Sequence, residues 1–198
     1  MDHSPGYSEG IRLKRVSLKS GIELHYAERG MRGRQTILLL HGYADSWHSF
    51  GRIFAALLRE YHVIAPDLRG HGDSDKPGAP YTLEAFTEDL LQFMNALGLE
   101  TVDLAGHSMG SLVAQSFAAQ HPERVGRLIL ISSAASMQEN NALIQIKPSI
   151  EALRDPVDRG FVVEFQTPSN PVPEAFMQEI ISESLKVPAH VWKGILAG

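Results

Sequence analysis

The chain has 198 residues, a formal net charge of −5, 43% hydrophobic and 21% charged residues, and no cysteine. This length fits one domain with an inserted lid, and the composition is ordinary for a globular protein. The lack of cysteine excludes disulfides, thiolate catalysis and cysteine-ligated metals, and the acidic balance argues against a nucleic-acid partner. Without an N-terminal leader pattern or an apolar run of about 20 residues, we expect a cytoplasmic protein that does not enter membranes.

The N-terminal region predicts an antiparallel hairpin. Residues 11–17 alternate apolar and polar side chains, as a half-buried strand does, and residues 22–28 alternate again after a Ser20–Gly21 turn. We expect this hairpin at the rim of a larger sheet. His25 falls on the polar phase of the second strand, which predicts a solvated side chain.

The run at residues 36–40 is continuously apolar and is typical of a parallel strand covered on both faces. It ends in His41-Gly-Tyr-Ala-Asp-Ser46, and the loops after such strands carry the ligand sites of open α/β sheets. Gly42 permits a tight turn that leaves the Tyr43 amide free to face a substrate oxygen. Since His41 belongs to the strand end, we interpret it as a structural hydrogen-bonding residue and not as a catalytic base.

Apolar side chains recur at helical spacing over residues 47–60, and residues 61–65 predict the next parallel strand. A polar loop with two glycines follows, at residues 66–77. Its Asp67 and Arg69 have two readings, as a catalytic acid with an anion binder or as an ion pair that holds the loop. The structural reading is favoured.

Further helices and strands alternate regularly beyond this loop. A helix is predicted from the N-cap Thr82 to Gly98, and another over residues 109–120. Residues 101–105 and 125–131 predict two more parallel strands. This alternation indicates an α/β fold with a doubly wound, mostly parallel sheet and right-handed crossovers.

The strand at 101–105 runs directly into Gly106-His-Ser-Met-Gly110 and then into a helix. Gly-x-Ser-x-Gly in a strand–turn–helix context is the pattern of a nucleophile elbow, which lifts the Ser108 hydroxyl above the sheet. A side chain at Gly106 or Gly110 would collide with the neighbouring strand or helix. The amides at the start of the following helix would face negative charge that develops on a substrate oxygen.

Beyond residue 136 the alternation ceases. Residues 137–198 contain short amphipathic helical pieces separated by prolines, with no strand beneath them. Such helices predict a lid that makes the pocket apolar and partly excludes water. We therefore divide the chain into a core at 1–136 and a helical cap at 137–198. We expect Trp47, Phe161 and Trp192 to line part of the pocket.

The loops at 41–43 and 67–77 and the motif at 106–110 occur in order and at compatible spacing. In these three motifs the chain resembles the α/β-hydrolase fold superfamily, specifically the capped esterase, lactonase and C–C hydrolase branch. The resemblance implies that Ser108 is the nucleophile and that the amides of Tyr43 and Met109 form the oxyanion hole, without cofactor or metal. Serine at 108, where dehalogenase and epoxide-hydrolase relatives carry aspartate, points to acyl transfer from an ester or lactone.

The family places an acid and a histidine after the cap, in that order. By the size of βαβ units, on the order of 60–80 residues that would carry both are absent, so we expect a C-terminally incomplete fold. Asp155, Asp158 and His190 lie among the cap helices with no strand to aim them, and His107 points elsewhere on so tight a turn. We assign none of them to the triad, whose acid and histidine would come from a missing segment or another chain.

Three functions remain open at this stage. The first is a serine hydrolase that takes a small, apolar, ester-like substrate. The second is an inactive truncated scaffold or small-molecule-binding protein, and the third is a lyase or perhydrolase on the same fold. Ending the sheet at residues 125–131 leaves a hydrophobic strand edge, so we also expect self-association.

Overall fold

One mixed sheet of six strands organises the computed structural model, which describes residues 10–57, 60–134 and 141–198. The strand order is β1-β2-β4-β3-β5-β6. The first two strands pair antiparallel, β2 pairs antiparallel with β4, and all other pairs are parallel. The predicted sheet with an antiparallel hairpin at its rim is thus confirmed. The strands are β1 (Arg12–Ser17), β2 (Glu23–Arg29), β3 (Thr36–Leu40), β4 (His62–Pro66), β5 (Val102–His107) and β6 (Val125–Ile131).

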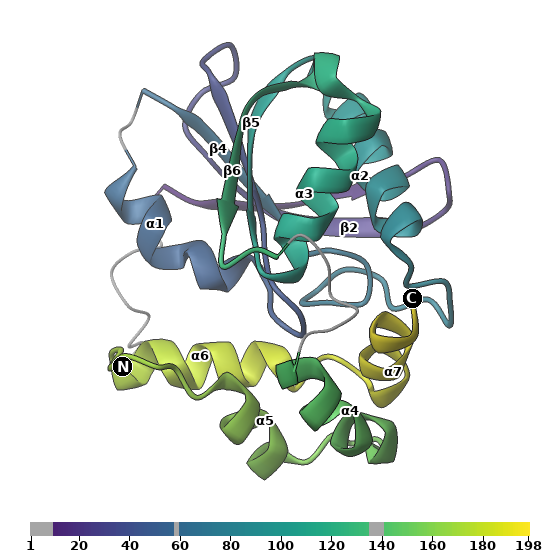
Figure 1. Cartoon of the computed structure of the whole chain (residues 1–198). Helices are drawn as coiled ribbons and strands as arrows, with labels where there is room; N and C mark the ends of the chain where they lie inside the picture. The colour runs from purple at the N-terminus through teal and green to yellow at the C-terminus, as the bar shows by residue number, and fades with distance from the viewer. Residues whose placement is uncertain (1–9, 58–59, 135–140) are drawn as a thin grey trace.

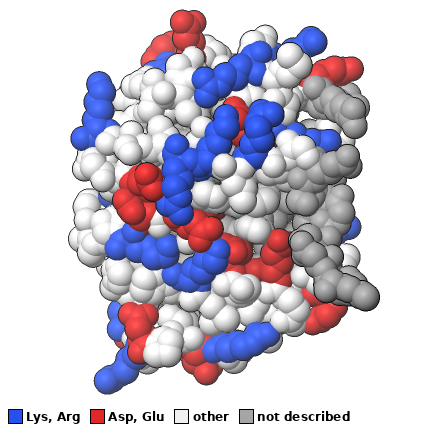
Figure 2. All heavy atoms as spheres, turned by 180° about the vertical axis from the view of Figure 1, so that it is seen from behind, with Lys and Arg blue, Asp and Glu red and all other residues white. Residues whose placement is uncertain are grey.

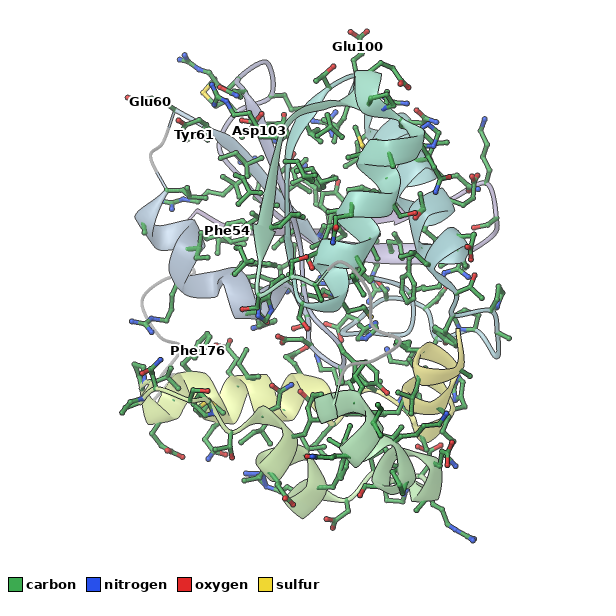
Figure 3. All side chains as sticks on the ribbon, in the orientation of Figure 1. Phe54, Glu60, Tyr61, Glu100, Asp103 and Phe176 are labelled. Atoms are coloured by element: carbon green, nitrogen blue, oxygen red, sulfur yellow. The ribbon has the colours of Figure 1, made fainter. Side chains whose placement is uncertain are left out.

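Helices cover both faces of this sheet (Figure 1). On one face lie the 3-10 turn η1 (Trp47–Phe50) and α1 (Gly51–Ala56), where the predicted longer helix ends early. Figure 3 shows Phe54 between α1 and the sheet, and its side chain is fully buried. The other face carries α2 (Leu83–Leu97) and α3 (Met109–Gln120), with the short turn η2 (Pro122–Arg124) after it. Each face has its own apolar cluster, so the doubly wound arrangement is confirmed.

Local sequence signals set the ends of α2 where they were predicted. The Thr82 side chain accepts a hydrogen bond from the amide of Ala85 at 3.3 Å, which satisfies one unpaired amide of the first turn. Gly98 takes φ 67° at the other end, a left-handed conformation open to glycine without steric cost. The helix is therefore fixed in register against α3, which begins at the residue after Ser108.

Four further helices lie across the carboxyl ends of the parallel strands (Figure 1): α4 (Asn141–Ala152), α5 (Arg159–Gln166), α6 (Glu174–Ser184) and α7 (Ala189–Ala197). Trp192 is fully buried at their centre, with its ring centroid 5.0 Å from that of Tyr43. At the far end of this layer the Arg52 guanidinium lies 5.9 Å from the ring of Phe176, the α6 residue labelled in Figure 3. The predicted boundary at residues 136 and 137 lies outside the described residues.

Charge and exposure complete the description. Figure 2 shows basic and acidic side chains interspersed on the face opposite to that of Figure 1. Among the described residues, none of the helices combines the length and apolar character that a bilayer crossing requires. At the edge of the sheet, the four residues from Leu128 to Ile131 expose 38–45% of their surface.

The prediction of a solvated His25 is wrong. Its side chain is buried, and Nδ1 lies 2.8 Å from Oδ2 of Asp67. The polar phase of β2 faces the loop that follows β4 and not solvent, since the Asp67 amide also donates to the His25 carbonyl at 2.8 Å. Alternation located the strand correctly, but it could not show that a distant loop covers this side of it.

Candidate active site

Ser108 lies at a sharp turn between β5 and α3. Its backbone adopts φ 51° and ψ −119°, a positive φ that side-chain-bearing residues rarely take. The Ser108 amide donates to the carbonyl of Ile131 at 3.0 Å, and the Ser108 carbonyl accepts from the amide of Ser111 at 2.9 Å. The strained turn is thus held from both sides by backbone hydrogen bonds.

The two glycines that flank Ser108 are required by close backbone approach. A Cβ on Gly106 would lie 2.2 Å from the carbonyl oxygen of Gly110. A Cβ on Gly110 would lie 2.3 Å from the carbonyl oxygen of Leu40. These distances are far below van der Waals contact, so the start of α3 can sit against the ends of β5 and β3 only because both positions lack a side chain.

The loop after β3 approaches Ser108 directly. A Cβ on Gly42 would lie 3.1 Å from Nδ1 of His107 and 3.3 Å from Cβ of Ser108. Within the described residues, neither the Tyr43 amide nor the Met109 amide donates a hydrogen bond. Met109 is the first residue of α3, where amides lack intrahelical partners and the helix dipole is positive. The turn therefore combines a strained serine with two backbone donors from neighbouring segments that have no partner among the described residues.

His41 holds this loop in place. Its side chain is fully buried, its Nδ1 donates to the carbonyl of Gly42 at 2.8 Å, and its Nε2 accepts from the amide of Leu68 at 2.9 Å. Both ring nitrogens are therefore occupied by the backbone. The interpretation of His41 as a structural hydrogen-bonding residue is confirmed.

Asp67 and Arg69 hold the neighbouring loop, but not by pairing with each other. Arg69 forms a buried two-point ion pair with Asp89 of α2, with both N···O distances 2.6 Å. The Asp67 carboxylate instead faces His25 and accepts from the amide of Trp47 at 2.8 Å. The structural reading is confirmed, and the expected ion pair between the two residues is wrong because each finds a partner on another element.

The same contacts fix the charge of Asp67. Burial raises the pKa of this carboxyl, but the hydrogen bond from His25 and the amides of Trp47 and Asp73 outweigh it and lower the pKa below its usual value. Asp67 is therefore ionised at neutral pH and fully engaged in holding the two loops together.

A cavity of about 690 Å³ opens above Ser108 and is lined mainly by apolar side chains. Tyr43, Ser108 and Met109 form the part nearest the turn. Lys147 is the one charged side chain of the lining in the described part of the chain. The remaining lining residues come from the Tyr81 loop, α2, α3, α4, α5 and the end of α7: Tyr81, Leu83, Phe86, Leu112, Val113, Leu143, Ile144, Phe165, Ile195, Leu196 and Gly198.

The predicted pocket lining is wrong for this cavity. Trp47 packs in the apolar cluster on the α1 face of the sheet. Trp192 is fully buried behind Tyr43, and Phe161 lines a smaller cavity of about 370 Å³ between α4 and α5. Sequence reasoning missed the contribution of Leu83 and Phe86, whose periodicity indicated only that they face the interior.

No described side chain is placed to accept the Ser108 proton. Within the described residues the hydrogen bonds of Ser108 all involve its backbone. Asp155 accepts from the amide of Ala189 at 2.7 Å, and Asp158 caps α5 at the amide of Phe161. His190 Nε2 lies 3.1 Å from the carbonyl of Pro77 at the surface.

The His107 side chain lies toward the loop after β3, beside Gly42. Burial lowers the pKa of His107, whose ring lies against the Gly42 backbone. Throughout residues 10–57, 60–134 and 141–198, no group of three or more histidine or carboxylate side chains is placed to hold a metal ion.

Comparison with known proteins agrees with this architecture. Residues 35–177 match the model of the alpha/beta hydrolase fold family, and the chain therefore belongs to that family. It is 36% identical over 133 residues to epoxide hydrolase 4 of Mus musculus, across 66% of this chain and 36% of that protein. It is 38% identical over 126 residues to lipase 1 of Psychrobacter immobilis, across 63% and 39% of the two chains.

A solved hydrolase from Pseudomonas aeruginosa PA01 superposes with a TM-score of 0.79 at 24% identity, over 98% of this chain and 72% of that one. This similarity concerns the fold alone. The chain spans little more than a third of the length of the two curated relatives.

Proposed function

We propose that the chain carries the nucleophile and the cap of a serine hydrolase that acts on carboxylic esters or lactones. The observation that carries this proposal is the position of Ser108, which lies on a strained turn at the floor of an apolar cavity, beside two amides that no described residue pairs. Serine at this position favours an acyl-enzyme route, in place of the aspartate route of epoxide-hydrolase relatives.

In the proposed reaction, Ser108 Oγ attacks the substrate carbonyl carbon and the carbonyl oxygen becomes an oxyanion. The amides of Tyr43 and Met109 donate to that oxygen, and the dipole of α3 adds to their stabilisation. A general base must take the serine proton, and we propose that the triad acid and histidine lie outside these 198 residues, in a C-terminal segment or another chain. When the oxyanion collapses, the C–O bond to the alcohol breaks, the leaving oxygen takes the proton back from that base, and Ser108 is left acylated. Water then attacks the acyl carbon while the same base accepts its proton, and Ser108 regains a proton from the base as the carboxylic acid leaves.

The cavity suggests the substrate class. Among the described lining residues all are apolar except Lys147, Ser108 and the tyrosines Tyr43 and Tyr81, and the volume of about 690 Å³ suits a ligand of drug-like size. We propose a small apolar ester-like substrate whose acyl or alcohol group lies between α2 and the helices α4 and α7. In this proposal residues 137–198 act as the cap that covers it.

A fluorophosphonate probe tests the proposal, because it labels a serine only where an oxyanion hole and an activated hydroxyl coincide. We expect labelling of the chain, supplied with a C-terminal segment from a longer relative, and its loss in Ser108→Ala. Ser116→Ala is the matched control, since Ser116 lies on the same helix and contacts Thr87 and Gln120 outside the cavity. If the chain is labelled neither with nor without the added segment, the proposal is contradicted.

A second candidate is an inactive scaffold or small-molecule-binding protein on the same fold. The specific observation in its favour is that no described side chain can accept the Ser108 proton. Ligand-induced thermal stabilisation without turnover would support it. Steady hydrolysis of a p-nitrophenyl ester that depends on Ser108 would exclude it, and a substrate screen would separate ester hydrolysis from a lyase or perhydrolase reaction.

A further inference from the structure

Ala44, the residue after Tyr43, has a backbone conformation that needs support. Its φ is 54°, in the left-handed region, although it carries a side chain. Such a conformation is unfavourable for a residue other than glycine and persists only where the surroundings enforce it. Ala44 is fully buried, so the enforcing contacts come from the protein and not from water.

His71, from the loop after β4, supplies one of these contacts. The amide of Ala44 donates to Nε2 of His71 at 3.2 Å, and Nδ1 of His71 donates to the carbonyl of Arg69 at 2.9 Å. The ring is fully buried, and its centroid lies 4.9 Å from that of His41 in an edge-to-face contact. His71 therefore touches both the loop backbone and the side chain that holds it.

The contact requires a neutral His71 with its proton on Nδ1, because a protonated Nε2 could not accept from Ala44. Burial is the main cause that lowers the pKa of His71, with the neighbouring His41 adding to it, and the pKa falls to about 3. The acceptor is thus available throughout the neutral range.

The two histidines fix the two peptide planes on either side of Tyr43. Peptide groups are planar and trans, so the Tyr43 N–H points away from the Gly42 carbonyl that His41 holds. The next plane, which joins Tyr43 to Ala44, is held by His71 through the Ala44 amide. With both planes fixed, the Tyr43 N–H keeps one direction.

We propose that His71 is a positioning residue for the oxyanion hole, which orients the Tyr43 amide by holding Ala44 in its left-handed conformation. The inference rests on the proposed function, since it assigns His71 a part in stabilising the oxyanion. His71 touches no substrate atom in this scheme. Its effect on the reaction passes entirely through the loop backbone.

Three substitutions separate positioning from simple packing. His71→Phe keeps a ring but removes both polar contacts. His71→Asn keeps a donor near Nδ1 for the Arg69 carbonyl but loses the acceptor for Ala44. His71→Gln places an amide oxygen near the former Nε2 and so restores the acceptor.

The measurement is the second-order rate constant of fluorophosphonate labelling, divided by the folded fraction of each variant. We expect the rate constant to fall roughly tenfold to a hundredfold in the Phe and Asn variants and to be partly rescued in the Gln variant, since a misdirected oxyanion donor costs on this order. His62→Gln is the matched control. His62 is equally buried and also bonds through both ring nitrogens, to Thr36 and Glu28, but it lies away from the cavity.

Three outcomes would overturn the proposal. Folded His71→Phe that labels at the wild-type rate removes the positioning role while leaving Ser108 as the nucleophile. An equal loss in His62→Gln would mean that the rate constant responds to replacement of any buried histidine and not specifically to the geometry of the Tyr43 loop. A wild-type chain that fails to label with an added C-terminal segment would contradict the proposed function, and this inference with it.

A measurement on the wild-type protein covers the case in which the variants do not fold. Nitrogen-15 NMR of the histidine rings reports the tautomer of each directly. We expect His71 to carry its proton on Nδ1, with a coupling or shift that identifies Nε2 as a hydrogen-bond acceptor. A proton on Nε2 at neutral pH would exclude the bond from Ala44 and overturn the proposal.

Discussion

The sheet has two flanks, the hairpin flank formed by β1 and β2 and the elbow flank formed by β5 and β6, and they are stabilised by different physical means. On the hairpin flank, Glu28 of β2 is almost fully buried and is held by Lys14 at 2.5 Å and by His62 at 2.8 Å. On the elbow flank, Ser108 and Ser132 follow β5 and β6 with φ values of 51° and 50°. The hairpin flank therefore relies on buried charge, and its close backbone approach falls on a glycine, Gly30, where a Cβ would lie 2.1 Å from the carbonyl oxygen of Tyr61. The elbow flank instead places positive φ on residues that carry side chains.

The two flanks also differ in where side-chain-bearing residues adopt a strained backbone conformation. The side-chain-bearing residues with positive φ in the described chain are Ala44, Ser108 and Ser132, and all three follow the carboxyl ends of parallel strands. Strain of this kind clusters at functional sites because the surrounding structure must over-determine it. Among the described residues of the hairpin flank no side-chain-bearing residue has a positive φ, and its buried charges are paired instead.

The largest expected effect comes from the elbow flank. Gly110→Ala places a Cβ 2.3 Å from the Leu40 carbonyl, so backbone must move, and we expect a loss of about 3 kcal/mol or more in the free energy of unfolding. Urea denaturation followed by circular dichroism measures it. Gly78→Ala is the control, since a Cβ there meets nothing within 4 Å. Equal stability of the two variants would refute the close approach.

The hairpin flank is tested by Glu28→Gln. Burial raises the pKa of Glu28, but hydrogen bonds from Lys14 and His62 outweigh it and lower the pKa from 4.5 to about 2. A tenfold change in an acid dissociation constant corresponds to about 1.4 kcal/mol, and the amide of glutamine keeps part of the hydrogen bonding. We therefore expect the free energy of unfolding to fall by about 2 kcal/mol at neutral pH, measured by urea denaturation.

The same substitution predicts a pH dependence. Because the folded pKa is the lower one, the contribution of Glu28 is complete above about pH 4.5 and is lost as the pH falls toward about 2. Urea midpoints of the wild type and the variant should therefore converge across that window. A constant difference down to pH 2 would mean that the charge of Glu28 is not what stabilises the hairpin.

The outer strands of the two flanks also differ. In β1, basic residues flank the exposed Leu13 on both sides. In β6, by contrast, four consecutive apolar residues are 38–45% exposed. An apolar edge of this kind tends to pair with another chain, and two copies of one strand can do so about a two-fold axis. We expect the chain to self-associate through β6 at micromolar concentration.

Leu130→Lys tests this expectation, because a charge in an apolar strand pair is costly. We expect the dissociation constant from analytical ultracentrifugation to rise by about tenfold or more. Leu13→Lys is the matched control, at a 57% exposed position of the other edge, and should leave association unchanged. A monomeric wild type, or equal effects of both variants, would contradict pairing through β6.

Local signals account for how much of the fold could be predicted. Alternation located the hairpin, apolar runs located the parallel strands, and the Gly106–Gly110 motif located the elbow, because each depends on neighbours in sequence. The interactions around the site join distant residues instead. His25 forms a side-chain hydrogen bond with Asp67, and Arg69 forms one with Asp89. The local sequence around His25 or Arg69 does not indicate which distant residue will be its partner.

The cavity shows the same limit. Leu83 and Phe86 have the spacing of any helix face, and only the position of α4 and α7 turns that face into cavity wall. The sequence places Trp192 among the residues expected to line the pocket, yet it is fully buried behind Tyr43. Packing between elements decides which apolar side chains remain accessible. The periodicity of a sequence contains no information about that packing.

The smallest expected loss in the free energy of unfolding comes from an exposed ion pair on the elbow flank. We compare it with a buried ion pair on the hairpin flank. Arg127 of β6 lies 3.5 Å from Asp103, with 69% of its side chain exposed, whereas Lys14 meets a Glu28 side chain that is 1% exposed. Water screens the first pair and Asp103 also accepts from Gln35, so Arg127→Gln should cost less than about 0.5 kcal/mol. Lys14→Gln should cost about 1 kcal/mol, because it leaves a buried carboxylate with fewer donors. Urea denaturation at low and high salt measures both, and an equal cost would mean that the elbow flank also depends on charge.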